Sequence, residues 1–166
     1  NQIEDPPYER LRGNTEYRAS VIAADWGGGG EDGNSRTVLA AGGINHAHFI
    51  DLVWGKMLPN PHDHIGEADE CLRHFKGFKP TRFAHDFTGA GTMRESMITT
   101  AGFPVDRLTP YEYVRSSRQK IVLKVPPKRG MPRRYWKLDK ARGMLMTIAG
   151  IKQGRARLFE ADYRSR

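Results

Sequence analysis

Apolar positions in the first third of the chain follow a pattern that predicts three consecutive strands. Residues 21–25 form a short, nearly continuous apolar run, which is typical of a central strand. Residues 37–41 and 48–54 are expected to form two further strands. Since short turns separate these segments, they predict an antiparallel meander.

The pattern then changes to helical spacing. Asn60 and Pro61 are an N-cap residue and a first-turn residue, and apolar positions recur at helical spacing until Gly77. A short apolar segment over residues 81–86 predicts the next strand. These segments together predict a helical crossover between two strands of one sheet.

The remaining sequence repeats this alternation. A second helix is expected over residues 92–102, where Thr and Glu stand at capping-box spacing. Residues 107–114 are expected to form a strand, residues 138–154 a third helix and residues 155–159 a last strand. The order predicts an α/β fold, a ribonuclease H-like mixed sheet in which an antiparallel three-strand meander is joined by parallel strands and flanked by helices. The residues expected in its core include Cys71, Trp26, Trp54, Met144, Leu145 and Met146.

Composition and charge narrow the range of partners. The chain has 166 residues, with 27 Lys and Arg against 19 Asp and Glu, a net charge of +8 and a pI near 9.8. This balance suits a polyanion or an anionic membrane surface. Because no apolar stretch approaches the roughly 20 residues that span a bilayer, we expect a soluble, intracellular protein. We expect no membrane binding, because the prolines of the basic segment 124–137 disfavour a continuous amphipathic helix. Residues 1–20 are polar and contain Pro6-Pro7, so we expect a linker there and one domain over residues 21–166.

The glycine-rich segment resembles a nucleotide-binding loop only in its spacing. Gly28, Gly30 and Gly33 spell G-x-G-x-x-G, but a strand pattern follows them instead of a helix. No Lys followed by Ser or Thr is present, as a Walker loop requires. We therefore favour a hairpin turn at the mouth of a site over a dinucleotide loop.

Two aspartates end expected strands. Asp25 ends the central strand, and Asp86 ends the strand that follows the first helix. A strand reached through a helical crossover runs parallel to its partner, and neighbouring strands lie about 4.8 Å apart. Carboxylates at matched ends can share a divalent cation, or bridge two cations about 3.5–4 Å apart. The alternative is that each aspartate only bonds its own turn backbone.

Three stretches resemble the C-terminal nuclease domain of the large terminase subunit of tailed bacteriophages. They are "ADWGGGGEDGNSRTVLAAGG", "AHDFTGAG" and "YWKLDKARGMLMTIAGIKQGRARLF". The resemblance implies a ribonuclease H-like fold, hydrolysis of DNA phosphodiesters with two Mg²⁺ or Mn²⁺ ions, and metal ligands at Asp25 and Asp86. It also implies a third acidic ligand near the end of the domain. Asp162 is the weak candidate in this sequence, and we expect that ligand to lie beyond Arg166.

The resemblance further implies partners and a setting. These are double-stranded DNA, a portal protein, a small terminase subunit and an ATPase domain that precedes residue 21 on the natural chain. The expected location is the host cell cytoplasm, outside the mature virion. Two alternatives stay open, a nuclease resembling Holliday-junction resolvases and a nonhydrolytic module that binds DNA or docks on the portal.

A basic segment is the expected DNA-binding surface. Between Val114 and Arg142 there are eleven Lys or Arg residues and one acid, Asp139, which is expected near a helix start. The segment "KVPPKRGMPRRYWK" predicts an exposed loop or β-hairpin. Its expected DNA contacts are Lys124, Lys128, Arg129, Arg133, Arg134 and Lys137. The alternative is a solvated basic face or a docking surface for an acidic protein.

Two histidine-containing segments are expected to have structural roles and not to bind metal. The segment 62–64, His-Asp-His, is read as a polar helix start instead of a zinc site, because consecutive helical residues point to different faces. His85 adjoins Asp86 but is expected to face the opposite side of its strand.

Overall fold

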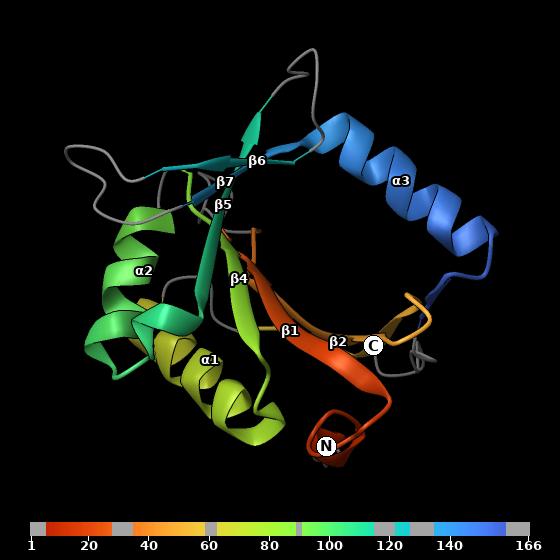
Figure 1. The fold of residues 1–166 in the computed structure, drawn as a ribbon. Coiled ribbons are helices and arrows are strands. Elements are labelled where there is room, and N and C mark those ends of the chain that lie inside the picture. The colour runs from red at the N-terminus through yellow and green to blue at the C-terminus, as the bar shows by residue number, and fades with distance from the viewer. Residues whose placement is uncertain are drawn as a thin grey trace.

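The computed structural model describes residues 6–27, 35–58, 63–88, 91–114, 122–126 and 135–158. Figure 1 shows these residues as one twisted mixed sheet with helices on both sides. The strands are β1 (Tyr17–Asp25), β2 (Val38–Asn45), β3 (Ile50–Met57), β4 (Arg82–Asp86), β5 (Leu108–Val114), β6 (Val122–Val125), β7 (Tyr135–Asp139) and β8 (Ala156–Arg157). The helices are α1 (His64–Phe78), α2 (Gly91–Thr100) and α3 (Lys140–Lys152), with two 3-10 turns, η1 (Tyr8–Arg10) and η2 (Val105–Arg107).

The strand order confirms the predicted fold class. The described strands are ordered β6-β7-β5-β4-β1-β2-β3-β8. Strand β2 pairs antiparallel with β1 and β3, whereas β4 pairs parallel with β1, and β5 parallel with β4. A meander followed by parallel strands on the other side of β1 is the ribonuclease H-like arrangement.

Helix α1 begins later than the sequence pattern predicts. The predicted cap Asn60 lies outside the described residues, and the helix starts at His64 with Asp63 as its N-cap. Asp63 Oδ1 accepts a hydrogen bond from the amide of Gly66 at 2.8 Å, which satisfies one of the free donors of the first turn. Asp63 and His64 are therefore the polar helix start that was expected. At the other end Lys79 closes the helix with a left-handed φ of 50°.

The N-terminal boundary also differs from the prediction. Strand β1 begins at Tyr17, so the expected boundary between residues 20 and 21 falls inside it. Before it, the Tyr8 ring packs edge-on against Phe78 at 4.7 Å, and Leu11 is buried in the core. These residues belong to the packed fold because their apolar side chains cover the end of α1. Whether an ATPase domain precedes them stays a prediction.

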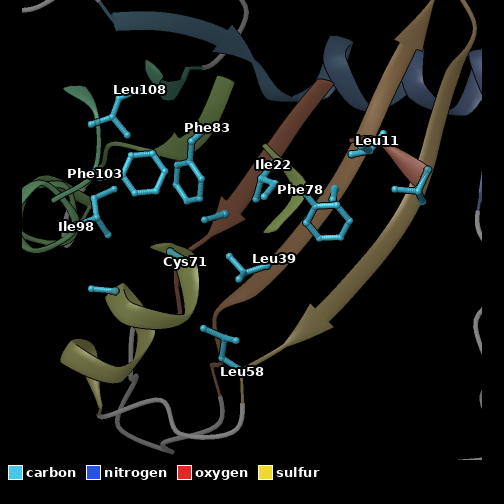
Figure 2. Packing of buried hydrophobic residues seen from close by; sticks show 14 residues of the cluster. Leu11, Ile22, Leu39, Leu58, Cys71, Phe78, Phe83, Ile98, Phe103 and Leu108 are labelled. Atoms are coloured by element: carbon cyan, nitrogen blue, oxygen red, sulfur yellow. The ribbon is translucent and has the colours of Figure 1, made fainter. Parts of the chain in front are cut away.

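Helices α1 and α2 lie together on one side of the sheet (Figure 1). Alternate residues of β1 and β2 are buried, as expected for strands with one covered face. Figure 2 shows Phe83 beside Phe103, and their ring centroids lie 4.9 Å apart. Cys71 is fully buried in this core, where burial raises the pKa of its thiol, so it fits the predicted structural role.

Helix α3 does not join this core. It lies on the other side of the sheet, and no residue of it is buried (Figure 1). Met144, Leu145 and Met146 are 57%, 66% and 59% exposed, so their predicted core position is wrong. Among the described elements, its main contacts are with β7, which precedes it, and β8, which follows it. Trp26 and Trp54, by contrast, pack against the core as expected.

Two further features complete the fold. Strands β6 and β7 form an antiparallel pair, in agreement with the β-hairpin alternative for the basic segment. Within the part of the chain that the structure describes, no helix is both long and apolar enough to cross a membrane.

Candidate active site

Strands β1 and β4 bring the two predicted aspartates to the same edge of the sheet. The strands run parallel, with Ala24 paired with His85. Asp25 and Asp86 are the next residue of each strand, so they end adjacent strands at the same level. Asp25 is exposed and Asp86 is half-buried. Both carboxylates are therefore accessible from solvent at one edge.

The carboxylate of Asp86 is held by its own turn. Its Oδ1 accepts hydrogen bonds from the amide of Thr88 at 2.8 Å and from the Thr88 hydroxyl at 2.6 Å. This geometry matches the alternative of a turn-forming aspartate. It is also compatible with ligation, because both hydrogen bonds go to one oxygen and fix the direction of the other. The turn thus orients the carboxylate in either role.

Tyr111 is a site residue that sequence reasoning missed. It lies on β5, directly beside Asp86, and its hydroxyl lies 3.5 Å from the carbonyl oxygen of Ala24. Burial raises the pKa of Tyr111, as do Tyr113 and the negative charges of Asp25 and Asp86. The hydroxyl therefore keeps its proton and remains a hydrogen-bond donor between the two strand ends. The sequence did predict a strand over residues 107–114, and pairing this strand in parallel with β4 would have placed Tyr111 beside Asp86.

His85 faces the opposite side of β4 from Asp86, as expected. Its side chain is fully buried, and Nε2 lies 2.8 Å from Glu95 Oε2 on α2. Glu95 was expected to close a capping box with Thr92. Helix α2 instead begins at Gly91, and Glu95 points inward to the histidine. The histidine belongs to the interior behind the site.

The glycine-rich segment connects two antiparallel strands. Asp25 pairs with Val38, so the segment joins β1 to β2, and no helix follows it. Residues 28–34 lie outside the described part of the chain. At its base, a Cβ on Gly27 would overlap the backbone of Ser35 and Arg36. The hairpin expectation therefore holds, and a dinucleotide loop lacks the helix that it needs.

A groove of about 480 Å³ opens beside Asp25. It is bounded by the ends of β5 and β7 and by the first turns of α3. Lys140 lies over the ring of Tyr113, with Nζ 5.0 Å from the ring centroid. The lining residues are Asp25, Tyr113, Leu138, Lys140, Gly143, Met144, Thr147 and Ile148. The groove is thus lined by both an acidic residue, Asp25, and a basic residue, Lys140.

The predicted DNA-binding residues are described only in part. Lys137 lies on β7, and its Nζ is 3.6 Å from Glu112 Oε2, with both side chains about one-third exposed. Lys124 lies on β6, and nothing is described of its side chain. The other expected DNA contacts lie outside the described residues; these contacts are Lys128, Arg129, Arg133 and Arg134. The weak ligand candidate Asp162 also lies outside them.

Asp139, the acid inside the basic segment, caps α3. Its Oδ1 accepts a hydrogen bond from the amide of Arg142 at 3.0 Å, and the residue is 1% exposed. This agrees with the expected place near a helix start. The described residues contain no group of three or more His, Cys, Asp or Glu side chains that could hold a metal ion.

Comparison with solved structures finds a structural likeness, whereas comparison of the sequence finds no match. No protein-family profile and no curated protein matches the chain. Among solved structures, the crystal structure of the yeast mitochondrial Holliday junction resolvase Ydc2 is similar, with a TM-score of 0.48 and 11% sequence identity. The likeness covers 92% of this chain and 72% of the resolvase chain. Function therefore has to be inferred from the side chains of this protein.

Proposed function

We propose that this chain is a metal-dependent endonuclease domain of a tailed-bacteriophage terminase large subunit, which cuts double-stranded viral DNA during packaging. The observation that carries the nuclease proposal is the placement of Asp25 and Asp86 at matched ends of adjacent parallel strands. The terminase part rests on the sequence resemblance. The proposed partners are the portal protein, the small subunit and an ATPase domain, in the host cell cytoplasm.

The donor atoms at this edge fit hard divalent cations. Carboxylate oxygens are the ligands that Mg²⁺ and Mn²⁺ prefer, and Asp25 and Asp86 would hold them. The described residues contain no cluster of three such ligands, so we assign the third to Asp162 or to another acidic residue outside the described part of the chain. When bound, such ions activate a water molecule and stabilise the leaving 3′ oxygen.

The surrounding residues have separate tasks. Thr88 fixes the direction of the Asp86 carboxylate through two hydrogen bonds. Tyr111 keeps its proton because burial and nearby negative charge raise its pKa, so its hydroxyl adds no negative charge beside the two carboxylates and donates to the Ala24 carbonyl. Lys140 lines the groove beside Asp25 and places positive charge next to the site, where a phosphate could lie.

The test is conversion of supercoiled plasmid to nicked and linear DNA in Mn²⁺, Mg²⁺ or EDTA. The chain is compared with Asp25→Asn and Asp86→Asn, which remove a charged ligand while keeping the shape of the side chain. Asp106→Asn is the control, because Asp106 is exposed and precedes β5, at the opposite edge of the sheet. We expect metal-dependent cutting that both site variants lose and the control keeps.

The same experiment separates the alternatives. Cutting that survives either site substitution would refute the assigned site. A preference for four-way junctions over linear duplex would favour a junction resolvase and count against the terminase part. Salt-dependent DNA binding that survives Asp25→Asn, without cutting in either metal, would support a nonhydrolytic module. In that case, a chain extended beyond Arg166 tests whether an added ligand restores cutting.

A further inference from the structure

Helices α1 and α2 place charged side chains in the interior directly behind the two aspartates. Glu67, Arg94 and Glu95 are 3%, 2% and 5% exposed, and His85 is fully buried. All four lie on the side of the sheet that α1 and α2 cover, whereas Asp25 and Asp86 lie at the carboxyl ends of β1 and β4. They form two neighbouring groups of polar contacts, one for each strand end.

The first group holds the end of β4. Glu95 Oε2 lies 2.8 Å from His85 Nε2, and His85 Nδ1 lies 3.1 Å from the carbonyl oxygen of Asp86. Helix α2 begins so close to this carbonyl that a Cβ on Gly91 would overlap it. The backbone of Asp86 is thereby confined between the histidine and the start of α2.

The second group holds the chain just after Asp25. Glu67 accepts hydrogen bonds from Arg94 Nη1 and, at 2.5 Å, from the hydroxyl of Thr37. The same hydroxyl accepts the amide of Gly27 at 3.0 Å, and Arg94 Nη2 donates to the Gly27 carbonyl at 3.4 Å. Both polar backbone atoms of Gly27, two residues after Asp25, are fixed by this group.

Trp26 connects the two groups. Its ring packs against the ring of His85, with the centroids 5.9 Å apart, and the guanidinium of Arg94 lies over it, 5.9 Å from the centroid. Since Trp26 follows Asp25 directly, a shift of α2 would move the ends of both strands together.

Stability alone does not explain these buried charges. Removing ions from water carries a free-energy penalty of several kcal/mol per ion, and apolar replacements of buried pairs are often equally or more stable. Groups that orient metal-binding side chains, however, typically change metal affinity about 10- to 100-fold when they are altered. We infer that Glu67, Arg94, His85 and Glu95, joined by Trp26, are positioning residues that set the separation of the Asp25 and Asp86 carboxylates for cation binding. This inference rests on the proposed function.

The test measures binding of Mn²⁺ alone, by electron paramagnetic resonance of the free ion, at a temperature where circular dichroism shows each variant to be folded. Glu95→Gln is compared with Glu70→Gln. Glu70 is a matched control because its Oε2 lies 3.2 Å from Nε2 of another fully buried histidine, His74, away from the site. We expect the Mn²⁺ dissociation constant to rise about 10-fold or more in Glu95→Gln and to stay within about twofold in Glu70→Gln.

A second matched pair decides the question if Glu95→Gln does not fold. Thr37→Val removes the hydroxyl that joins Gly27 to Glu67. Thr81→Val removes a hydroxyl with the same double role just before β4, where it accepts from the Ser20 amide at 3.0 Å and donates to the Ser20 carbonyl at 2.5 Å. Only the first variant should weaken Mn²⁺ binding.

The outcomes separate this inference from the proposed function. If the unaltered chain shows no Mn²⁺ binding that depends on Asp25, the proposed function fails and the inference fails with it. If the chain binds Mn²⁺ and the site variants match their controls, the positioning role is refuted and the metal site stands.

Discussion

His74 should make the stability of this protein depend on pH in mildly acidic solution. The side chain is fully buried on α1, 4.4 Å from the ring of Trp54 between centroids. Tyr8 Oη lies 3.1 Å from Nδ1, and Arg73 Nη2 and Glu70 Oε2 lie 3.1 Å and 3.2 Å from Nε2. Burial, together with the positive charge of Arg73, lowers the pKa of His74 from 6.5 to about 4.

The direction and size of the effect follow from this difference. Below pH 6.5 the unfolded chain binds a proton at His74 that the folded chain does not bind until the pH approaches 4. The folded state therefore loses stability as the pH falls through this interval. Proton binding to the unfolded chain lowers the free energy of unfolding by about 2 kcal/mol between pH 7 and pH 5, and by about 3 kcal/mol between pH 7 and pH 4.

Urea unfolding at pH 7, 6, 5 and 4 measures this loss. The variant His74→Gln removes the titrating ring and keeps a hydrogen-bonding side chain, so its free energy of unfolding should change about 3 kcal/mol less over the same interval. His46→Gln, at an exposed histidine, is the control and should follow the unaltered chain. Equal pH dependence in His74→Gln and the unaltered chain would refute the reasoning. Hydrogen bonds from Arg73 and Lys56 outweigh burial and lower the pKa of Glu70 from 4.5 to about 2, so Glu70 also reduces stability, by about 1 kcal/mol, as the pH falls to 4. Because Glu70 is present in both chains, the difference between them reports His74.

Two further predictions concern packing. Phe83→Ala should lower the free energy of unfolding by about 3–5 kcal/mol, because it empties a fully buried position between the rings of Phe103 and Trp26; a loss under about 1 kcal/mol in urea unfolding would contradict this packing. Gly91→Ala should lower the melting temperature, because its Cβ would overlap the Asp86 carbonyl, whereas Gly143→Ala, where the nearest atom of Leu138 lies 3.6 Å away, should keep or raise it. Equal melting temperatures of the two variants in a thermal scan would contradict the close approach of α2 to Asp86.

The sequence was sufficient for the placement of Asp25 and Asp86. The sequence contains an apolar strand that ends in Asp, then a helix, then another strand that ends in Asp. This order implies two parallel neighbouring strands with their ends at the same level, and β1 and β4 pair in this way. Periodicity could not show that α3 stays uncovered. A helix with apolar residues on several sides is equally consistent with burial, and only the tertiary arrangement places Met144 and Leu145 in solvent.

The interior charges could not be predicted in the same way. Glu67 and Arg94 stand 27 positions apart, and each alone looks like an ordinary surface residue of a helix. Their pairing depends on the contact of α1 with α2, which no local pattern encodes. Tyr111 was missed for a related reason, because its nearness to the aspartates depends on the pairing of β5 with β4.

The central position of β1 has a consequence for how the protein opens. This strand is paired on both sides, with β2 and β4, whereas β6 and β8 are the edge strands of the described sheet. Edges and ends open first in native proteins, and doubly paired central strands exchange their amide hydrogens last. Hydrogen exchange should therefore protect Ile22 and Ala24 most strongly, so β1 would stay paired with β2 and β4 while the outer strands β6 and β8 open.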